Sequence, residues 1–162
     1  MTISVGDQLP DASLLRLGED GPESIDLSSL TSDRRVVIFG LPGAYTGTCT
    51  TAHVPSFIRS MDDLKEKGVE EVICVAVNDP FVMGAWADST GAGAAGITML
   101  ADSDATLTKA LGMDFTAPPA GLYDRSKRFA LVAENGKVTV LHEEENPGLC
   151  DVSGGEAIVA AL

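Results

Sequence analysis

One cysteine stands where a run of β-branched residues gives way to a helix-like segment. The stretch GLPGAYTGTCTTAHVPSF, residues 40–57, places Cys49 among small, hydroxylated and turn-forming residues. A thiol is a strong nucleophile only as the thiolate, which a helix N-terminus or a nearby cation stabilises. The position therefore favours nucleophilic or redox chemistry. Because most intracellular cysteines are small buried hydrophobes, position alone leaves a purely structural Cys49 equally open.

The neighbours of Cys49 supply groups that such chemistry needs. Hydroxyls that could cap the helix or bind a substrate come from Thr46, Thr48, Thr50 and Thr51. A tight loop that could bring backbone N–H groups toward the thiol is indicated by Pro42, Gly43 and Gly47. These residue types fit a thiolate held at the start of a helix.

A longer motif around the cysteine resembles that of a known family. The pattern P-x-x-x-T-x-x-C, filled by Pro42, Thr46 and Cys49, is similar to the peroxidatic motif of peroxiredoxins. The full stretch PGAYTGTCTTAHVP resembles the type II, or atypical two-cysteine, group. So do VNDPFVMGAW (77–86) and YDRSKRFALV (123–132). The resemblance covers most of the chain and keeps the order of its elements.

The resemblance implies a thiol-dependent peroxidase that reduces hydrogen peroxide and alkyl hydroperoxides. In such an enzyme Cys49 attacks the peroxide and becomes a sulfenic acid. Thr46 would bind the peroxide, Pro42 would shield the pocket, and Arg128 would stabilise the thiolate and the charge developing on oxygen. A guanidinium suits that task because it stays charged and offers several donors, and Arg125 is a second candidate. This displacement needs no metal or organic cofactor, so we expect none.

His53 lies four residues after Cys49, so the two would share one face of a helix and could form half of a metal site. No second pair has ligand spacing, because His142 and Cys150 are eight residues apart in a polar segment. The favoured interpretation is a histidine hydrogen-bonded beside the active loop. The GAGAAG stretch (91–96) has the spacing of a dinucleotide motif, but it follows a helix and precedes a strand, which favours a loop.

Two further cysteines bear on how the sulfenic acid is resolved. Cys74 lies in VICVAV, a strand expected to be buried on both faces, where a thiol is inert. Cys150 lies in EENPGLCDVSGG, a loop expected to be exposed and mobile, which resembles the loop that carries the resolving thiol in atypical members. Cys150 is therefore the resolving candidate. Nearby acidic residues would raise its pKa, so direct capture by glutathione or glutaredoxin is an equal alternative.

The resemblance also implies partners. The regenerating reductant would be glutathione, glutaredoxin or thioredoxin. In the family, the surface around the active loop and the DPFVM segment forms a dimer contact, so we expect a homodimer. Four residues are assigned to that interface: Tyr45, Phe81, Met83 and Trp86.

The elements that must position these residues alternate along the chain. Buried strands are predicted at VVIFG (36–40), VEEVICVAVN (69–78) and ITML (97–100), each followed by a helix-like segment. Asp79 is the expected N-cap of the second helix, with Pro80 at its first position.

The C-terminal third predicts a hairpin and a closing helix. RFALVAENGKVTVLH (128–142) reads as two strands joined at Asn135-Gly136, and GGEAIVAAL (154–162) as a helix. The order β-α-β-α-β-α-β-β-α predicts one α/β domain over residues 1–162. Its fold would be a thioredoxin-like three-layer sandwich with a mixed central sheet.

Composition and charge narrow the classes of function and location. With 11 Lys and Arg against 24 Asp and Glu, the net charge of -13 argues against nucleic acid and anionic membranes as partners. No apolar run approaches the roughly 20 residues that span a bilayer. Three cysteines do not make a secreted disulfide framework. We therefore expect a cytoplasmic protein, although a transit peptide already removed would leave no trace, so an organelle stays open.

Two other functions would use the same fold or the same thiol. A thioredoxin-type disulfide exchanger uses C-x-x-C, but Ala52 occupies the position three after Cys49, which argues against that role. A redox sensor or a chaperone-like holdase would use an oxidisable Cys49 without turnover. Rapid peroxide consumption with a thiol donor would separate the enzyme from the sensor.

Overall fold

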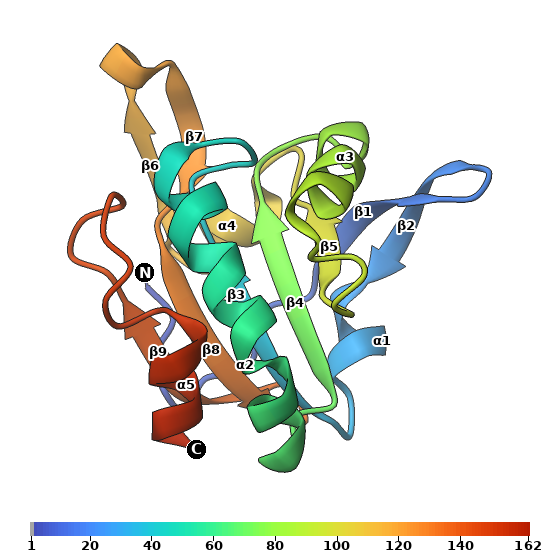
Figure 1. Cartoon of the computed structure of the whole chain (residues 1–162), viewed down its shortest axis with the longest axis vertical. Coiled ribbons are helices and arrows are strands. Elements are labelled where there is room, and N and C mark those ends of the chain that lie inside the picture. The colour runs from blue at the N-terminus through green and yellow to red at the C-terminus, as the bar shows by residue number, and fades with distance from the viewer. Residues whose placement is uncertain (1) are drawn as a thin grey trace.

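A seven-stranded mixed sheet runs through the middle of the molecule in this computed structural model, which describes residues 2–162 (Figure 1). The strand order is β2-β1-β5-β4-β3-β8-β9. The strands are β1 (Ser13–Gly18), β2 (Gly21–Asp26), β3 (Arg35–Gly40), β4 (Glu71–Ala76), β5 (Thr98–Ala101), β8 (Phe129–Glu134) and β9 (Lys137–Glu143). Neighbouring strands pair in parallel at β3–β4 and β4–β5, and the other neighbouring pairs of this sheet are antiparallel. Met1, the first residue of the predicted domain, lies outside the described residues.

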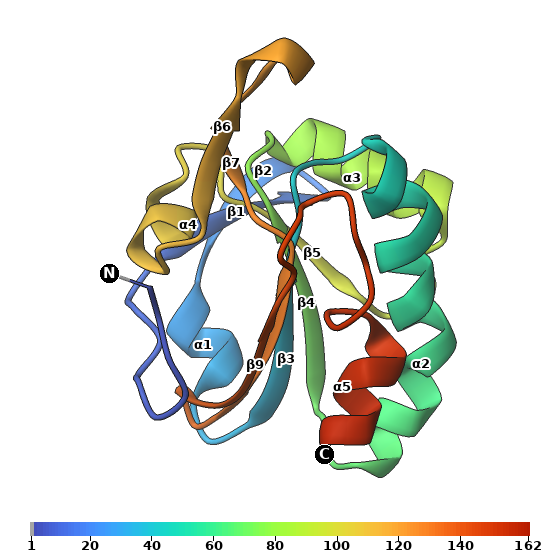
Figure 2. The same cartoon turned by 90° about the vertical axis from the view of Figure 1, so that its left-hand side faces the viewer.

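Helices cover both faces of this sheet and make the three layers that the sequence predicts (Figure 2). One face carries α2 (Val54–Glu66), α3 (Pro80–Thr90) and α5 (Gly155–Ala161). The other carries the short helices α1 (Leu27–Thr31) and α4 (Thr106–Ala110). None of the helices formed by residues 2–162 is long and apolar enough to cross a membrane.

The central strands are apolar at nearly every position because both of their faces are buried. Val37 and Phe39 of β3 belong to the core cluster that also holds Phe57 of α2. Val36 and Ile38 point the other way, into the cluster under α1 and α4. Each fully buried aliphatic or aromatic side chain of this kind contributes about 1.5 to 3 kcal/mol. The continuous run in the sequence thus reports a strand between two helical layers.

Two local predictions are confirmed in atomic detail. The carboxylate of Asp79 accepts a hydrogen bond of 2.8 Å from the backbone N–H of Val82, so it caps α3. Asn135 and Gly136 both have positive φ values, 50° and 77°, between β8 and β9. That is the backbone of the tight hairpin turn that Asn-Gly favours.

Two hairpins of the structure were not predicted from the sequence. The first pairs β1 with β2, and the second pairs β6 (Asp114–Ala117) with β7 (Leu122–Ser126). Their strands are short and largely exposed or half-buried, so they lack the apolar run that marks a central strand. A 3₁₀ turn, Pro118–Ala120, joins β6 to β7, and this hairpin projects from the body of the molecule (Figures 1 and 2).

The strand register sets which residues meet at the carboxyl end of β3. Gly40, the last residue of β3, pairs with Phe129, the first of β8. Arg128 therefore stands beside the loop that leaves β3 and leads to Cys49. Gly40 is required at this pair, because a Cβ there would come within 2.2 Å of the ring of Phe129.

Candidate active site

Cys49 begins a π-helical turn, Cys49–His53, that leads directly into α2. The backbone N–H of Val54 donates to the carbonyl of Cys49. This bond spans five residues, whereas the bonds of an α-helix span four. Such widened turns are frequent at functional sites. The side chain of Cys49 is fully buried at the N-terminal end of this helical segment, where the helix dipole favours a negative charge.

Arg128 connects the thiol to its surroundings through all three nitrogens of its guanidinium. Nη2 donates to Sγ of Cys49 at 3.2 Å, and Nη1 donates to Nδ1 of His53 at 3.0 Å. Nε donates to the carbonyl of Pro147 at 2.9 Å. The residue is only 2% exposed, so the fork is held in one orientation. A buried cation aimed at the sulfur stabilises the thiolate form.

The hydrogen bonds of His53 determine its tautomer. An arginine can only donate, so Nδ1 of His53 accepts from Arg128, and Nε2 donates to the carbonyl of Ser153 at 3.0 Å. Burial of the ring, with Arg128 next to it, lowers the pKa of His53 to about 3. The imidazole is therefore neutral at physiological pH. With both nitrogens engaged, it is a positioning group for Arg128 and has no lone pair left for a metal ion.

The loop before the cysteine is fixed by its own hydrogen bonds. The hydroxyl of Thr46 donates to the carbonyl of Gly43 at 2.7 Å, which leaves its oxygen lone pairs free to accept. Arg125 donates from Nη1 to the carbonyl of Pro42 at 2.9 Å. Arg125 therefore holds the loop, while Arg128 is the arginine that reaches the sulfur.

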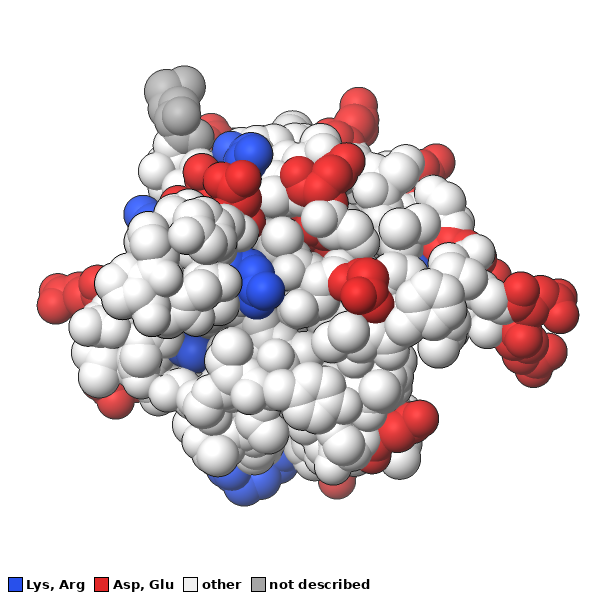
Figure 3. Space-filling model, turned by 90° about the horizontal axis from the view of Figure 1, so that it is seen from above, with Lys and Arg blue, Asp and Glu red and all other residues white. Residues whose placement is uncertain are grey.

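A pocket of about 540 Å³ opens beside the thiol. Its walls are formed by Pro42, Thr46, Gly47, Thr48, Phe115, Ala117, Leu122, Arg128, Asn146, Pro147 and Gly148. Figure 3 looks onto this end of the molecule and shows basic groups in a hollow between neutral surfaces, with acidic groups around it and one near the middle of the face. Cys49 itself is fully buried behind this wall, and Arg128 is the wall residue that is hydrogen-bonded to its sulfur.

Part of this pocket was missed by the sequence analysis. Phe115, Ala117 and Leu122 come from the β6–β7 hairpin, which was not predicted. The alternation of apolar and polar residues in Asp114–Ala117 is the only signal, and four residues are too few to use it.

The segment 144–153 contacts Arg128, His53 and Thr48 through its backbone carbonyls, and the sequence analysis did not predict these contacts. Arg128 bonds to the carbonyl of Pro147, and His53 to that of Ser153. The hydroxyl of Thr48 donates to the carbonyl of Gly148 at 2.9 Å. The sequence marked this segment only as a loop around Cys150, because every residue type offers the same carbonyl.

The other two cysteines lie in different surroundings. Cys74 is fully buried in β4 and shares one core cluster with Cys49. Burial raises its pKa well above the usual value, and a charge on Cys49 adds to that effect.

Cys150 differs from its expected exposure, because it is half-buried. Burial is the main cause that raises its pKa, while Arg128 opposes the rise. The acidic residues Glu144 and Glu156 contribute less than the sequence analysis expected. In the reduced protein, neither Cys74 nor Cys150 is hydrogen-bonded to an arginine as Cys49 is.

The four residues assigned to a dimer interface separate into two pairs. Tyr45 and Phe81 are 56% and 60% exposed and can meet a partner. Met83 and Trp86 are buried inside the chain, so the structure corrects their assignment to a surface. Trp86 instead supports the cysteine turn, since its Nε1 donates to the hydroxyl of Thr50 at 3.1 Å.

Comparisons with known proteins agree with this site. The Redoxin family matches residues 4–159. Peroxiredoxin-2C of Oryza sativa subsp. japonica is 47% identical over 99% of this chain and 98% of its own. The chain belongs to the peroxiredoxin family, in its type II group. Reduced Prx3 of Vibrio vulnificus in complex with hydrogen peroxide superposes on this peroxiredoxin with a TM-score of 0.90, at 43% identity over 99% of both chains. A Burkholderia cenocepacia protein named a thioredoxin reductase has a TM-score of 0.95, at 40% identity over 100% of this chain and 99% of its own.

This peroxiredoxin is a thiol peroxidase, and Cys49 is its peroxidatic residue. The thiolate attacks one oxygen of the peroxide and the O–O bond breaks. The second oxygen leaves as hydroxide or alkoxide and takes a proton from water. The sulfur is thereby oxidised to a sulfenic acid, and the peroxide is reduced. Nη2 of Arg128, 3.2 Å from the sulfur, lies where both the thiolate and the developing oxyanion need a cation.

Proposed function

We propose that this enzyme reduces hydrogen peroxide and small alkyl hydroperoxides. The observation that carries the proposal is the contact between Arg128 and Cys49 at the wall of an open pocket. The hydroxyl oxygen of Thr46 accepts a hydrogen bond from the O–H of the hydroperoxide, since its own hydrogen is donated to the carbonyl of Gly43. Pro42 closes the loop side of the pocket, where Arg125 fixes it. Displacement at oxygen is fast when such groups are already in place.

Replacement of the thiol tests this proposal. Cys49→Ser removes the nucleophile and is expected to abolish peroxide consumption, measured by stopped flow with hydrogen peroxide and with a small alkyl hydroperoxide. Cys74→Ser is the matched control, because it changes a buried cysteine other than the one to which Arg128 donates, and it should keep nearly full turnover. A Cys49→Ser variant that retains most of the activity would refute the mechanism.

We also propose that Cys150, rather than Cys74, forms any intramolecular disulfide with oxidised Cys49. Cys150 is half-buried on a loop, whereas Cys74 lies inside β4 under helices α2 and α3. Direct capture by glutathione or glutaredoxin is the competing route, with thioredoxin as a further reductant. Peptide mapping after one equivalent of peroxide tests the pairing. A bridge between Cys49 and Cys74 would refute it, and glutathione on Cys49 alone would exclude Cys150.

A homodimer is the last part of the proposal. Tyr45 and Phe81 expose aromatic rings next to the active loop, and such residues are enriched at interfaces. Phe81→Glu should therefore lower the mass measured by light scattering. A wild-type protein that stays monomeric at high concentration would contradict the assignment. The cytoplasmic location remains a prediction.

A further inference from the structure

A closed ring of hydrogen bonds lies behind the active site. The backbone N–H of Glu144 donates to the carbonyl of Arg128 at 3.0 Å. The carboxylate of Glu144 accepts from the backbone N–H of Ser153 at 2.7 Å and from its hydroxyl at 2.6 Å. Ser153 then accepts from His53, and His53 accepts from the guanidinium of the same Arg128. The ring thus begins and ends at the arginine that contacts Cys49.

The register of the sheet produces the first contact of this ring. Phe129 of β8 pairs with Glu143 of β9, so the residues just outside the pair, Arg128 and Glu144, also lie side by side. This backbone bond fixes where the side chain of Glu144 starts, and the carboxylate then determines where Ser153 stands.

Glu144, at 6% exposed, is one of two acidic residues buried in the described part of the chain, and Asp102 is the other. Its Oε2 accepts three hydrogen bonds, from the backbone N–H groups of Val152 and Ser153 and from the hydroxyl of Ser153. Among the ion pairs formed by residues 2–162, none includes Glu144. Burial opposes ionisation, but the hydrogen bonds from Ser153 and its neighbours outweigh it, and the pKa of Glu144 is lowered. The buried carboxylate of Glu144 therefore holds the backbone of Val152 and Ser153 in place.

We propose that Glu144 is a positioning residue for peroxide reduction, which orients Arg128 toward the thiolate of Cys49 through Ser153 and His53. The carbonyl of Ser153 is what keeps the proton of His53 on Nε2. Only in that tautomer can Nδ1 accept from Nη1 of Arg128. Once Nη1 is held in this way, and Nε is held by Pro147, the planar guanidinium leaves Nη2 directed at the sulfur.

A purely structural role for Glu144 predicts something different. A carboxylate that only stabilises the loop would lower the melting temperature when it is removed, and it would leave the folded active site unchanged. A positioning role predicts a change in the site of the folded protein, at temperatures well below unfolding. Arg128 is the charged group hydrogen-bonded to Cys49, while His53 beside that arginine is neutral and the thiol of Cys74 shares the core cluster of Cys49, so the response of Cys49 reports mainly on Arg128.

The test compares Glu144→Ala with Glu144→Gln and with the control Glu145→Gln. Glu145 is adjacent in the chain and exposed, so Glu145→Gln removes one negative charge as Glu144→Gln does but leaves the ring of hydrogen bonds intact. Alkylation of Cys49 by iodoacetamide across pH is followed by mass spectrometry of its peptide. The tautomer of His53 is read from nitrogen-15 NMR, and the peroxide step is measured by stopped flow.

For Glu144→Ala we expect the midpoint of the alkylation profile to rise by about one pH unit and the peroxide step to slow about tenfold, as for loss of one hydrogen bond to a charged group. His53 should no longer hold its proton on Nε2 alone. Glu144→Gln keeps an oxygen for the two backbone N–H groups and should recover most of the rate. Glu145→Gln should match the wild type.

The proposal is overturned if Glu144→Ala keeps both the tautomer of His53 and the alkylation profile while its melting temperature falls. Should that variant fail to fold, Glu144→Asp, which withdraws the carboxylate by one methylene, is judged by the same two measurements. The inference rests on the peroxidase reaction at Cys49. Because the alkylation profile and the tautomer need no peroxide, they decide on Glu144 even if the proposed substrates prove wrong.

Discussion

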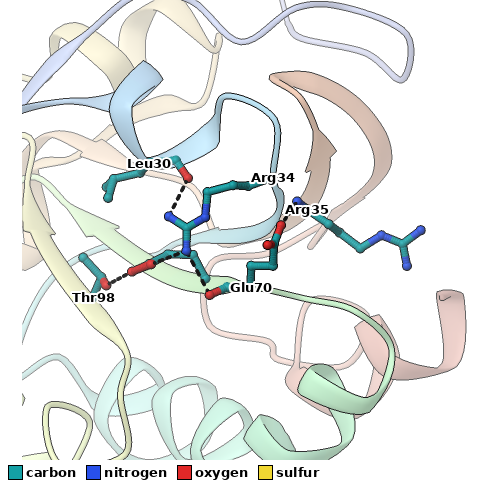
Figure 4. A network of polar contacts seen from close by, with 6 residues as sticks. Leu30, Arg34, Arg35, Glu70 and Thr98 are labelled. Carbon is teal, nitrogen blue, oxygen red and sulfur yellow. Dashed lines mark hydrogen bonds and ion pairs between the residues drawn. The ribbon is translucent and has the colours of Figure 1, made fainter.

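Arginine-centred networks lie at both ends of β3, and they differ in what surrounds the guanidinium. Where β3 begins, Arg34 donates to the carboxylate of Glu71 at 3.1 Å, and Arg35 pairs with Glu134 at 2.8 Å. Figure 4 shows the Arg34 part of this network, in which Arg34 also donates to the carbonyls of Leu30 and Glu70. Where β3 ends, the guanidinium of Arg128 donates hydrogen bonds to a backbone carbonyl, a neutral imidazole and the sulfur of Cys49. Among the ion pairs of residues 2–162, none includes Arg128.

The comparison indicates why one arginine supports chemistry and the others support the fold. A carboxylate neutralises the charge of a guanidinium. A neutral imidazole and a carbonyl orient the guanidinium without neutralising that charge. The charge of Arg128 is therefore available to the thiolate and to the oxygen that becomes negative. Arg34 and Arg35 are about one-third exposed, so water screens their pairs, and they contribute little beyond local order.

The largest expected effect comes from Arg128. Arg128→Ala removes a preorganised cation, which is expected to raise the barrier of the peroxide step by about 2 to 4 kcal/mol. Stopped-flow oxidation of Cys49 measures this rate. Arg35→Ala is the matched control, because it removes the same charge at the other end of β3 and should leave the rate unchanged. If Cys49 is oxidised at the same rate in both variants, the proposed difference in function between the two arginine networks is wrong.

An effect of intermediate size is expected when the pH is lowered. Acid should first reduce the free energy of unfolding through His53, the neutral partner of Arg128. His53 has a folded pKa of about 3, against about 6.5 in an unfolded chain, so only the unfolded state gains its proton between those values. Stability should therefore fall as the pH drops through this window, by about 2 kcal/mol between pH 7 and pH 5 from this group. Denaturant unfolding at a series of pH values measures the loss.

The control for this pH dependence is His53→Gln, which cannot titrate. It should be less stable at pH 7 and should lose much less stability than the wild type down to pH 5. If the free energy of unfolding of the wild type does not change between pH 7 and pH 5, then His53 accepts a proton in the folded state and the prediction is wrong.

The smallest effect is expected where the carboxylates already neutralise arginine. Arg35→Ala removes the pair with Glu134 and should lower the free energy of unfolding by no more than about 1 kcal/mol. Added salt should shrink the difference further, because it screens exposed pairs. Denaturant titration in low and high salt gives both numbers. A loss several times larger, independent of salt, would mean that this network is not a mere surface pair.

Much of the fold followed from local patterns in the sequence. The apolar runs of β3 and β4, the cap at Asp79 and the Asn135-Gly136 turn each depend on residues close together in the chain. The β6–β7 hairpin did not follow, because its short strands bury too little to show a period. That hairpin nevertheless supplies one wall of the pocket.

By itself, the sequence determined the reactive thiol and its family, since Pro42, Thr46 and Cys49 stand in one short motif. It also named Arg128 as the better of two arginines. Only the tertiary structure decided what holds that arginine, because the ring through Glu144, Ser153 and His53 is made largely of backbone groups that every residue shares. Such contacts leave no mark on composition or spacing. They exist only once the fold brings together residues far apart in the chain, such as His53 and Arg128, which are 75 positions apart, and His53 and Ser153, which are 100 positions apart.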